Sequence, residues 1–163
     1  TTSIQTAQGC SSATHGYYAG GNLNKDIHKY SHSTDGNATD VGEIAGDTSN
    51  YSRRATGSSS YSHGYYAAGS YFSNQIHKFS FASESTQIDV GDLLNSVTAV
   101  SSTSSYTHGY VHGGLGGYPS TNVYINIIQK YSYTVDADAT DVGDLGSPRS
   151  LGADMAEGCG QQY

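Results

Sequence analysis

Three histidines recur in nearly the same sequence context, and their side chains are the first candidates for chemistry. The stretches THGYYAGG, SHGYYAAG and THGYVHGG begin at positions 14, 62 and 107. Imidazole nitrogens bind metals and transfer protons near neutral pH. A zinc site, however, needs its nitrogens within about 2.1 Å of one ion, and equivalent positions of a repeat are held apart. We therefore expect His15, His63 and His108 to stabilise turns through hydrogen bonds to the backbone and to bind no metal.

Two acidic segments have the alternating oxygen ligands that are typical of calcium loops. They are DGNATD at 35–40 and DADATD at 136–141. The equivalent segment at 84–89 reads ESTQID and loses that spacing, and no segment has the distal bidentate glutamate of a helix-loop-helix calcium site. An Asx-type turn that leads into a strand accounts for all three segments without an ion.

Two further charged positions recur once in every unit. An aspartate begins the motifs DVGEI and DVGDL, and a lysine lies in IHKYS, IHKFS and IQKYS. We expect the aspartates to accept backbone hydrogen bonds beside a glycine bulge. We expect the lysines to extend along the surface or to pair with a neighbouring carboxylate. The residues are Asp40, Asp89 and Asp141, and Lys29, Lys78 and Lys130.

Composition excludes several classes of function. The chain has a net charge of -7, and its seven lysines and arginines are scattered, which argues against binding a row of phosphates. No stretch approaches the roughly 20 apolar residues needed to span a bilayer. GxSxG, a cysteine beside a base and a phosphate-binding loop are all absent, so we expect no catalytic residue and no cofactor. Cys10 and Cys159 leave two interpretations open, one long-range disulfide or two small buried thiols.

The histidine motif is one of three landmarks that repeat in a fixed order. It recurs after 48 and 45 residues, and the DVG motif recurs after 49 and 52. The lysine motif lies between them in every unit. This periodicity predicts a single repeat domain over 1–163, with units at about 1–50, 51–98 and 99–148, and with 149–163 as the first strand of a further unit.

Each unit contains four segments with strand character. The first strand is exemplified by residues 55–61 of the second unit. The second, third and fourth strands are exemplified by 16–21, 27–32 and 38–44 of the first unit, and Gly, Asp, Asn and Ser turns separate them. Adjacent tyrosines, Tyr17–Tyr18 and Tyr65–Tyr66, point to opposite faces of a strand, so both faces of the sheet must be covered. We expect an all-β fold with almost no helix.

The units resemble the kelch-like β-propeller repeats. The resemblance rests on the glycine pair after the second strand, an aromatic residue in the third strand and an arginine before the first. The matching residues are Gly20–Gly21 and Gly113–Gly114, then Tyr30, Phe79 and Tyr131, then Arg53 and Arg149. The chain departs from the kelch pattern in having no tryptophan, and the second unit has Ala68–Gly69 in place of the pair.

The resemblance implies three four-stranded propeller blades. Known propellers have roughly four to eight blades, so the three belong to a longer ring or close by oligomerisation, with two copies as the simplest case. A β-trefoil, which closes with three four-stranded units in one chain, is the alternative. The combination of HGYxxGG, HKYSF-like and TDxNATDVGDL segments is similar to repeat proteins of marine bacteriophages and other aquatic viruses.

These resemblances lead to three hypotheses for function. The first is a non-enzymatic structural or adhesive module of a virion surface or fibre, or of another extracellular surface, with partners among further blades, other copies, virion proteins or host-surface glycans. The second is a lectin-like protein that binds carbohydrate through irregular loops. The third, implied only by the kelch resemblance, is a copper oxidase. Candidate binding residues are Tyr71, Asn74, His112, Tyr118, Asn122 and Tyr124.

Overall fold

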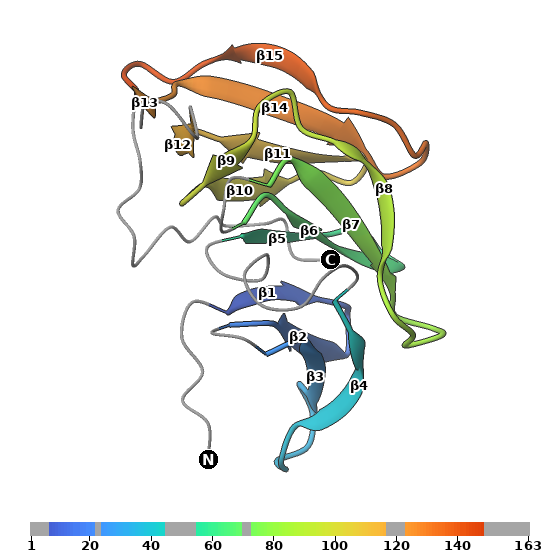
Figure 1. Cartoon of the computed structure of the whole chain (residues 1–163). Helices are drawn as coiled ribbons and strands as arrows, with labels where there is room; N and C mark the ends of the chain where they lie inside the picture. Colours follow the sequence, from blue (N-terminus) through green and yellow to red (C-terminus); the bar gives the residue numbers. More distant parts are fainter. Residues whose placement is uncertain (1–6, 22–23, 45–54, 70–72, 117–122, 149–163) are drawn as a thin grey trace.

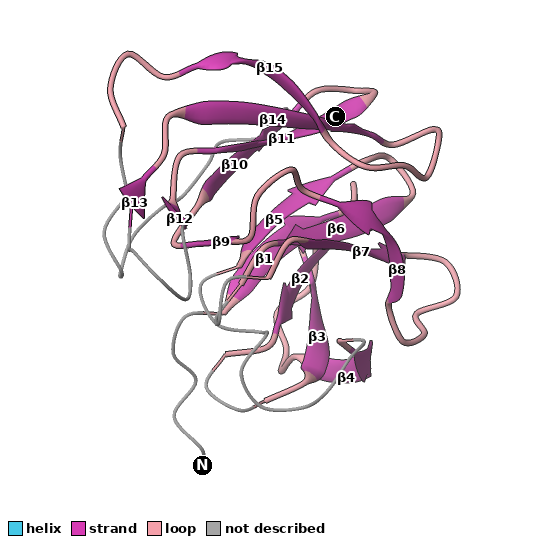
Figure 2. Ribbon diagram, turned by 45° about the horizontal axis from the view of Figure 1, so that its top comes forward, coloured by secondary structure: helices cyan, strands magenta, loops and turns pink. Residues whose placement is uncertain are grey.

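The computed structural model describes residues 7–21, 24–44, 55–69, 73–116 and 123–148, and these residues form strands and loops without any helix. Figure 2 shows this all-β character. Twelve of the strands form three four-stranded sheets. The first contains β1 (Gln8–Ser11), β2 (His15–Ala19), β3 (Asp26–Ser31) and β4 (Thr39–Glu43). The second contains β5 (Thr56–Ser59), β6 (His63–Ala67), β7 (Gln75–Ser80) and β8 (Ile88–Asp92). The third contains β10 (Ser101–Ser104), β11 (His108–His112), β14 (Ile127–Ser132) and β15 (Thr140–Asp144).

All three sheets have the same antiparallel order, in which each strand pairs with the one before it in the unit. Their registers also agree: the histidine that begins the second strand pairs with a serine of the third, as in His15↔Ser31 and His63↔Ser80. The expectation of four short strands per unit is therefore confirmed, and so is the all-β fold. Among the described residues there is also no helix that could cross a membrane.

A fourth, smaller sheet lies beside the third unit. It pairs β12 (Leu115–Gly116) with both β9 (Val97–Thr98) and β13 (Val123–Tyr124). β12 and β13 lie in the segment after Gly114, an insertion that makes this loop longer than the equivalent loops of the first two units. β9 comes from the connection between the second and third units. The insertion thus extends the end of the third unit instead of interrupting its four-stranded sheet.

The three large sheets lie one beside the next, with β1 next to β5 and β5 next to β10. Figure 1 shows the first sheet at the bottom, the second in the middle and the third at the top. A Cβ on Gly57 would clash with the carbonyl oxygen of Gly9, so the glycine lets β1 and β5 approach closely.

Two hydrophobic clusters fill the spaces between the sheets. Tyr17, Ile27, Tyr66 and Phe79 are among the buried residues of one. Tyr65, Ile76, Val111 and Tyr131 are among those of the other. Each cluster combines residues from two neighbouring units, so burial of the sheet faces depends on stacking. The segment expected to begin a further unit, 149–163, and the two arginines at 53 and 149 lie outside the described residues.

Candidate functional site

The histidine turns have the same geometry in all three units. In the first, Ser12 N–H donates to the His15 carbonyl (2.9 Å) and His15 N–H donates to Ser12 Oγ (3.0 Å). The imidazole Nδ1 lies 2.8 Å from Thr14 Oγ1. Equivalent contacts recur at Ser60 and His63 and at Ser105 and His108. The backbone contact that was expected of the histidine side chain is thus made by a serine three residues earlier, and the imidazole bonds to a hydroxyl instead.

The recurrent aspartates lie beside a bulge in the outer strand of each sheet. Asp40 Oδ1 accepts a hydrogen bond from Gly42 N–H at 3.2 Å. The ladder between β3 and β4 shifts register at this point. Asp89 and Asp141 make the same contact with Gly91 and Gly143, at 3.2 and 2.9 Å. These carboxylates therefore fix the backbone of the bulge.

Neighbouring sheets are joined by a lysine of one unit and an acidic residue of the next. Lys29 Nζ donates to both carboxylate oxygens of Glu84, at 2.7 and 2.9 Å. Lys78 Nζ donates to both oxygens of Asp136, each at 2.7 Å. Asp136 belongs to one of the two calcium-like segments, so in this segment the acid holds a lysine. The described residues contain no group of three or more His, Cys, Asp or Glu side chains that could hold a metal ion.

Aromatic rings stack across the same two junctions. The ring centroids of Tyr17 and Phe81 are 4.7 Å apart, and those of Tyr65 and Tyr133 are 4.5 Å apart. Tyr17 Oη also donates to Glu84 Oε1 at 3.3 Å. Burial, and then the charge of Glu84, raises the pKa of Tyr17 to about 12. The phenol therefore stays protonated at neutral pH and acts as a hydrogen-bond donor.

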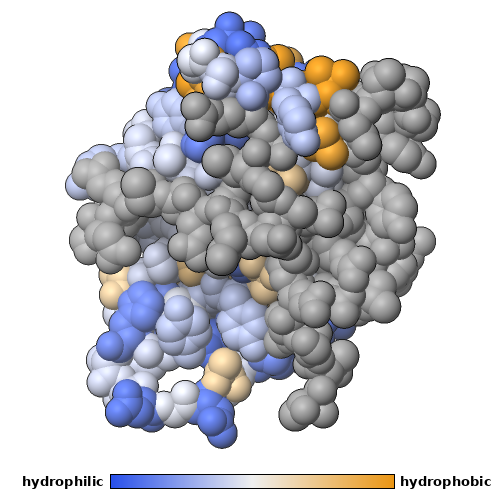
Figure 3. All heavy atoms as spheres, turned by 90° about the vertical axis from the view of Figure 1, so that its left-hand side faces the viewer, coloured by the Kyte–Doolittle hydropathy of each residue, from blue (hydrophilic) through white to orange (hydrophobic). Residues whose placement is uncertain are grey.

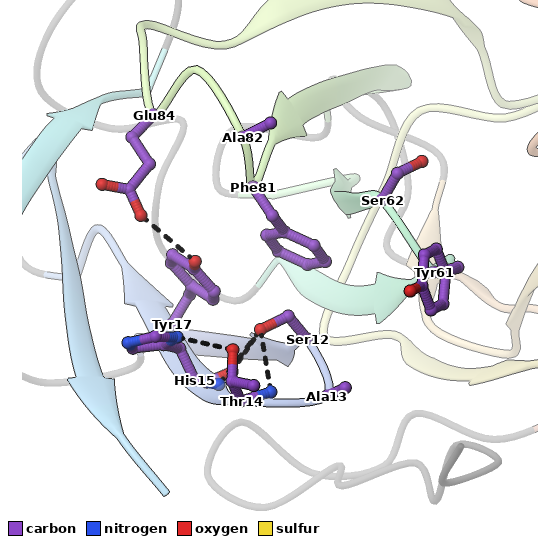
Figure 4. A pocket seen from close by; sticks show the side chains of 10 residues that line it. All are labelled: Ser12, Ala13, Thr14, His15, Tyr17, Tyr61, Ser62, Phe81, Ala82 and Glu84. Carbon is purple, nitrogen blue, oxygen red and sulfur yellow. Dashed lines mark hydrogen bonds between the residues drawn. The ribbon is translucent and has the colours of Figure 1, made fainter.

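A cleft of about 420 Å³ opens between the first two units at the end that carries the histidine turns. Figure 4 shows Tyr17 and Phe81 facing each other, with Glu84 on one side of them and Tyr61 on the other. Tyr61 is 78% exposed. The lining residues are Ser12, Ala13, Thr14, His15, Tyr17, Tyr61, Ser62, Phe81, Ala82 and Glu84. The cleft thus offers aromatic faces, hydroxyls and one carboxylate.

Of the six binding residues proposed from the sequence, the three that the structure describes do not line this cleft. Tyr71, Tyr118 and Asn122 lie outside the described residues. Asn74 is half-buried, and its carbonyl accepts a hydrogen bond from Leu93 N–H at 2.6 Å. Tyr124 is exposed on β13. His112 is half-buried at the end of β11, and burial lowers its pKa.

Sequence reasoning missed Tyr61, Phe81 and Glu84. A search for residues that break the repeat pattern passes over them, because each belongs to a turn or strand that recurs in every unit. One available signal was the tyrosine before the Ser/Thr-His pair, which occurs as Tyr61 and Tyr106 in two units and is Ala13 in the first.

The one cysteine that the structure describes is shielded. Cys10 Sγ lies 3.0 Å from Tyr66 Oη, and burial raises the pKa of the thiol to about 12. A thiol with a raised pKa is a poor nucleophile and a poor metal ligand at neutral pH. Cys159, its expected disulfide partner, lies outside the described residues.

No protein-family model matches the chain, and no curated protein is similar to it. The fold is similar to that of a solved structure described as "Structure of YjhT", with a TM-score of 0.75 and 12% sequence identity. The match covers 89% of this chain and 52% of that one. The chain therefore spans about half the length of this structural neighbour, and the likeness concerns the fold alone.

Proposed function

We propose that this protein is a non-enzymatic structural or adhesive module in which each four-stranded sheet is one blade of a β-propeller. The proposal rests on one observation: the charged side chains that recur in the units form ion pairs between neighbouring sheets. The lysines and acids of Lys29–Glu84 and Lys78–Asp136 pair across neighbouring units. Such groups hold a scaffold together, and a reaction centre needs an unequal set of groups that converge on one point.

The blade assignment has two supports. Each unit is a four-stranded antiparallel sheet whose faces are covered by the next unit, as propeller blades require. The match covers only 52% of the structural neighbour, which agrees with a ring that needs more than three units. The partners proposed for the module are further units of the same kind, and virion proteins or host-surface glycans. Its place on a virion or other extracellular surface rests on the sequence resemblance to viral repeat proteins.

The non-enzymatic assignment is tested with copper, the cofactor of the oxidase hypothesis. The purified chain is incubated with Cu(II), freed of excess metal, analysed for bound copper and assayed for hydrogen peroxide release from alcohols. We expect no stoichiometric copper and no turnover, because the raised pKa of Cys10 keeps its thiol protonated at neutral pH. One copper per chain together with sustained peroxide release would overturn the assignment.

Carbohydrate binding is a second candidate, and the cleft between the first two units favours it. The exposed ring of Tyr61 offers a face for a sugar ring. The hydroxyls of Ser12, Thr14 and Ser62 line the same cleft and suit the hydroxyls of a sugar. A glycan array probed with the labelled chain tests this candidate.

Substitution of Tyr61 locates the binding. Tyr61→Ala is expected to weaken binding to any positive glycan by about tenfold or more, since a stacked aromatic contributes on the order of 1.4 kcal/mol or more. Tyr106→Ala is the matched control, because this exposed tyrosine occupies the equivalent turn of the third unit and does not line the cleft. An empty array, or equal losses from both substitutions, would count against the cleft.

A further inference from the structure

The contacts between units follow one rule, in which the lysine of each unit pairs with the acidic residue of the next. Lys29 of the first unit pairs with Glu84 of the second, and Lys78 of the second pairs with Asp136 of the third. Alignment of the units places Lys130 at the lysine position of the third unit and Asp35 at the acidic position of the first. These two residues have no ion pair among the residues that the structure describes.

The aromatic residue that follows each of these lysines is buried where two units meet and exposed in the first unit. Phe79 and Tyr131, in the third strands of the second and third units, are 1% and 3% exposed. Tyr30 occupies this position in the first unit and is 47% exposed. Among the described residues, no other unit covers this ring. The outer face of the first unit therefore exposes an aromatic side chain, whereas the equivalent side chains of the other two units are buried.

Backbone packing at the outer strands repeats the pattern. A Cβ on Gly42 would lie 3.0 Å from the Ser85 carbonyl oxygen, and one on Gly91 would lie 2.6 Å from that of Ala137. Both junctions also have a backbone hydrogen bond, Gln87 N–H to the Glu43 carbonyl at 3.0 Å and Ala139 N–H to the Asp92 carbonyl at 2.8 Å. Each outer-strand glycine thus lies against the acidic loop of the next unit.

The two ends of the row lack these contacts. Among the described residues, a Cβ added to Gly143 of the third unit would have no neighbour within 4 Å, and the same holds for Gly36 in the acidic loop of the first. Val142, beside Gly143, is 45% exposed, whereas its equivalents Val41 and Val90 are half-buried. Figure 1 shows the first and third sheets at opposite ends of the row. In Figure 3 hydrophobic atoms gather at the top, the height of the third sheet, and the lower end is mostly hydrophilic.

We propose that the outer face of the third unit binds the outer face of the first unit of a second copy, with Lys130 of one copy paired to Asp35 of the other. This inference rests on the proposed stacking of units and adds its closing surface. The occupant is a second copy because the two faces complement each other in charge, with Lys130 on one and Asp35 on the other. In addition, the chain spans 52% of its structural neighbour, so two copies supply the length of one such fold. A head-to-tail interface of this kind closes into a ring when the rotation allows.

The proposal is tested by light scattering after size exclusion at a series of protein concentrations. The wild-type chain is expected to have twice its chain mass of 17.1 kDa. Lys130→Glu and Asp35→Lys each place like charges at both interfaces of a two-copy ring and are expected to return the protein to the single-chain mass. Neither side chain has an internal ion pair in the described structure, so the fold is expected to survive, and circular dichroism checks this.

Mixing the two variants gives the sharpest outcome. In a mixed pair, Lys130 of the Asp35→Lys chain meets Asp35 of its partner, and the introduced Glu meets the introduced Lys. Both interfaces are then attractive, so an equimolar mixture is expected to regain the doubled mass, as is a chain that carries both substitutions. Lys25→Glu is the charge-matched control and is expected to leave the doubled mass unchanged, since Lys25 is at neither the lysine nor the acidic position of the pairs between units.

Three results would overturn the proposal. They are a wild-type chain of single mass at all concentrations, a mixture that stays at single mass, and a Lys25→Glu chain that dissociates as Lys130→Glu does. A mass above two copies would overturn closure by a pair. Glycan and copper binding do not enter this measurement, so its failure leaves the adhesive module and its carbohydrate candidate to be judged on their own tests.

Discussion

At the scale of residues, one position in the third strand shows how a repeat distributes polar groups. It is occupied by His28, His77 and Gln129 in the three units. His28 Nε2 lies 3.6 Å from Asp26 Oδ2, and Gln129 is buried with its Oε1 accepting from Leu94 N–H at 2.7 Å. His77 is buried, and burial lowers its pKa below the ordinary value of 6.5, an effect that the charge of Asp89 partly offsets.

This lowered pKa predicts a loss of stability in mild acid. As the pH falls through about 6.5 the unfolded chain protonates this histidine before the folded chain does, so the unfolded state binds more protons. The free energy of unfolding is therefore expected to fall between about pH 7.5 and about pH 5. His77→Gln, the residue that the third unit uses, is expected to reduce this slope, as measured by urea unfolding at several pH values.

Part of the slope should remain in the His77→Gln variant, because burial also lowers the pKa values of His63 and His112. Asn74→Gln, a substitution outside the titrating groups of the second unit, serves as a control and is expected to leave the slope unchanged. A His77→Gln chain with the full wild-type slope would contradict the assignment.

Residue identities predicted which side chains recur, but not which partners they meet. The sequence indicated that Lys29 or Lys78 extends along the surface or pairs with a carboxylate, and the acid proves to belong to the next unit. That acid lies 55 or 58 residues away in the chain, so local spacing gives no sign of it. Tyr61 was missed for a similar reason, since the cleft beside it forms only when two units meet.

At the scale of elements, the junction between units rests on close contact of the inner strands. Gly57 on β5 lies against the Gly9 carbonyl on β1, and an added Cβ would clash there. Gly57→Ala is therefore expected to destabilise the fold by about 1–3 kcal/mol, since overpacking forces the backbone to move. Gly9→Ala is the matched control, because its nearest neighbour would be the Tyr17 oxygen at an ordinary 3.6 Å. Chemical denaturation of both variants measures the difference, and equal losses would contradict this packing.

The lysine pairs between sheets should contribute to stability where both partners are partly buried. Lys29→Met leaves Glu84 without its cation while Tyr17 still bonds to it. We expect a loss of about 1–2 kcal/mol, less than the several kcal/mol that follow the breaking of a fully buried pair. Lys25→Met removes a lysine without an ion pair in the described residues and is expected to change stability by less than about 0.5 kcal/mol. A Lys29→Met loss no larger than that of Lys25→Met would show that the pair contributes nothing.

Element boundaries followed from the sequence where the landmarks repeat. Turn residues around each histidine and each acidic segment placed four strands per unit, and the structure has them in that order. The strands β9, β12 and β13 were not predicted. Each has only two residues, so none has an alternating pattern, and pairing with one another alone defines them.

At the scale of the whole molecule, three landmarks that recur at nearly constant spacing predicted the repeated units, and the strand segments between turn residues predicted the all-β architecture. It did not predict whether the units close into a ring, since a repeat period does not state how many units an assembly contains. The structure adds which residues lie on the outer faces of the end sheets. Lys130, Val142 and Gly143 lie on the third sheet, and Tyr30 and Asp35 belong to the first unit.

If these ends meet in a second copy, thermal stability must depend on protein concentration. A folded pair that dissociates on unfolding gains stability as concentration rises. The unfolding enthalpy is roughly 0.7 kcal/mol per residue, summed over both chains of the pair. This enthalpy predicts a rise in Tm of about 2 °C per tenfold increase in protein concentration. Lys130→Glu removes the charge pair and is expected to abolish this dependence while Lys25→Glu retains it, as scanning calorimetry at several concentrations can measure. A wild-type Tm that stays constant over two orders of magnitude in concentration would mean that the end sheets are not buried by association.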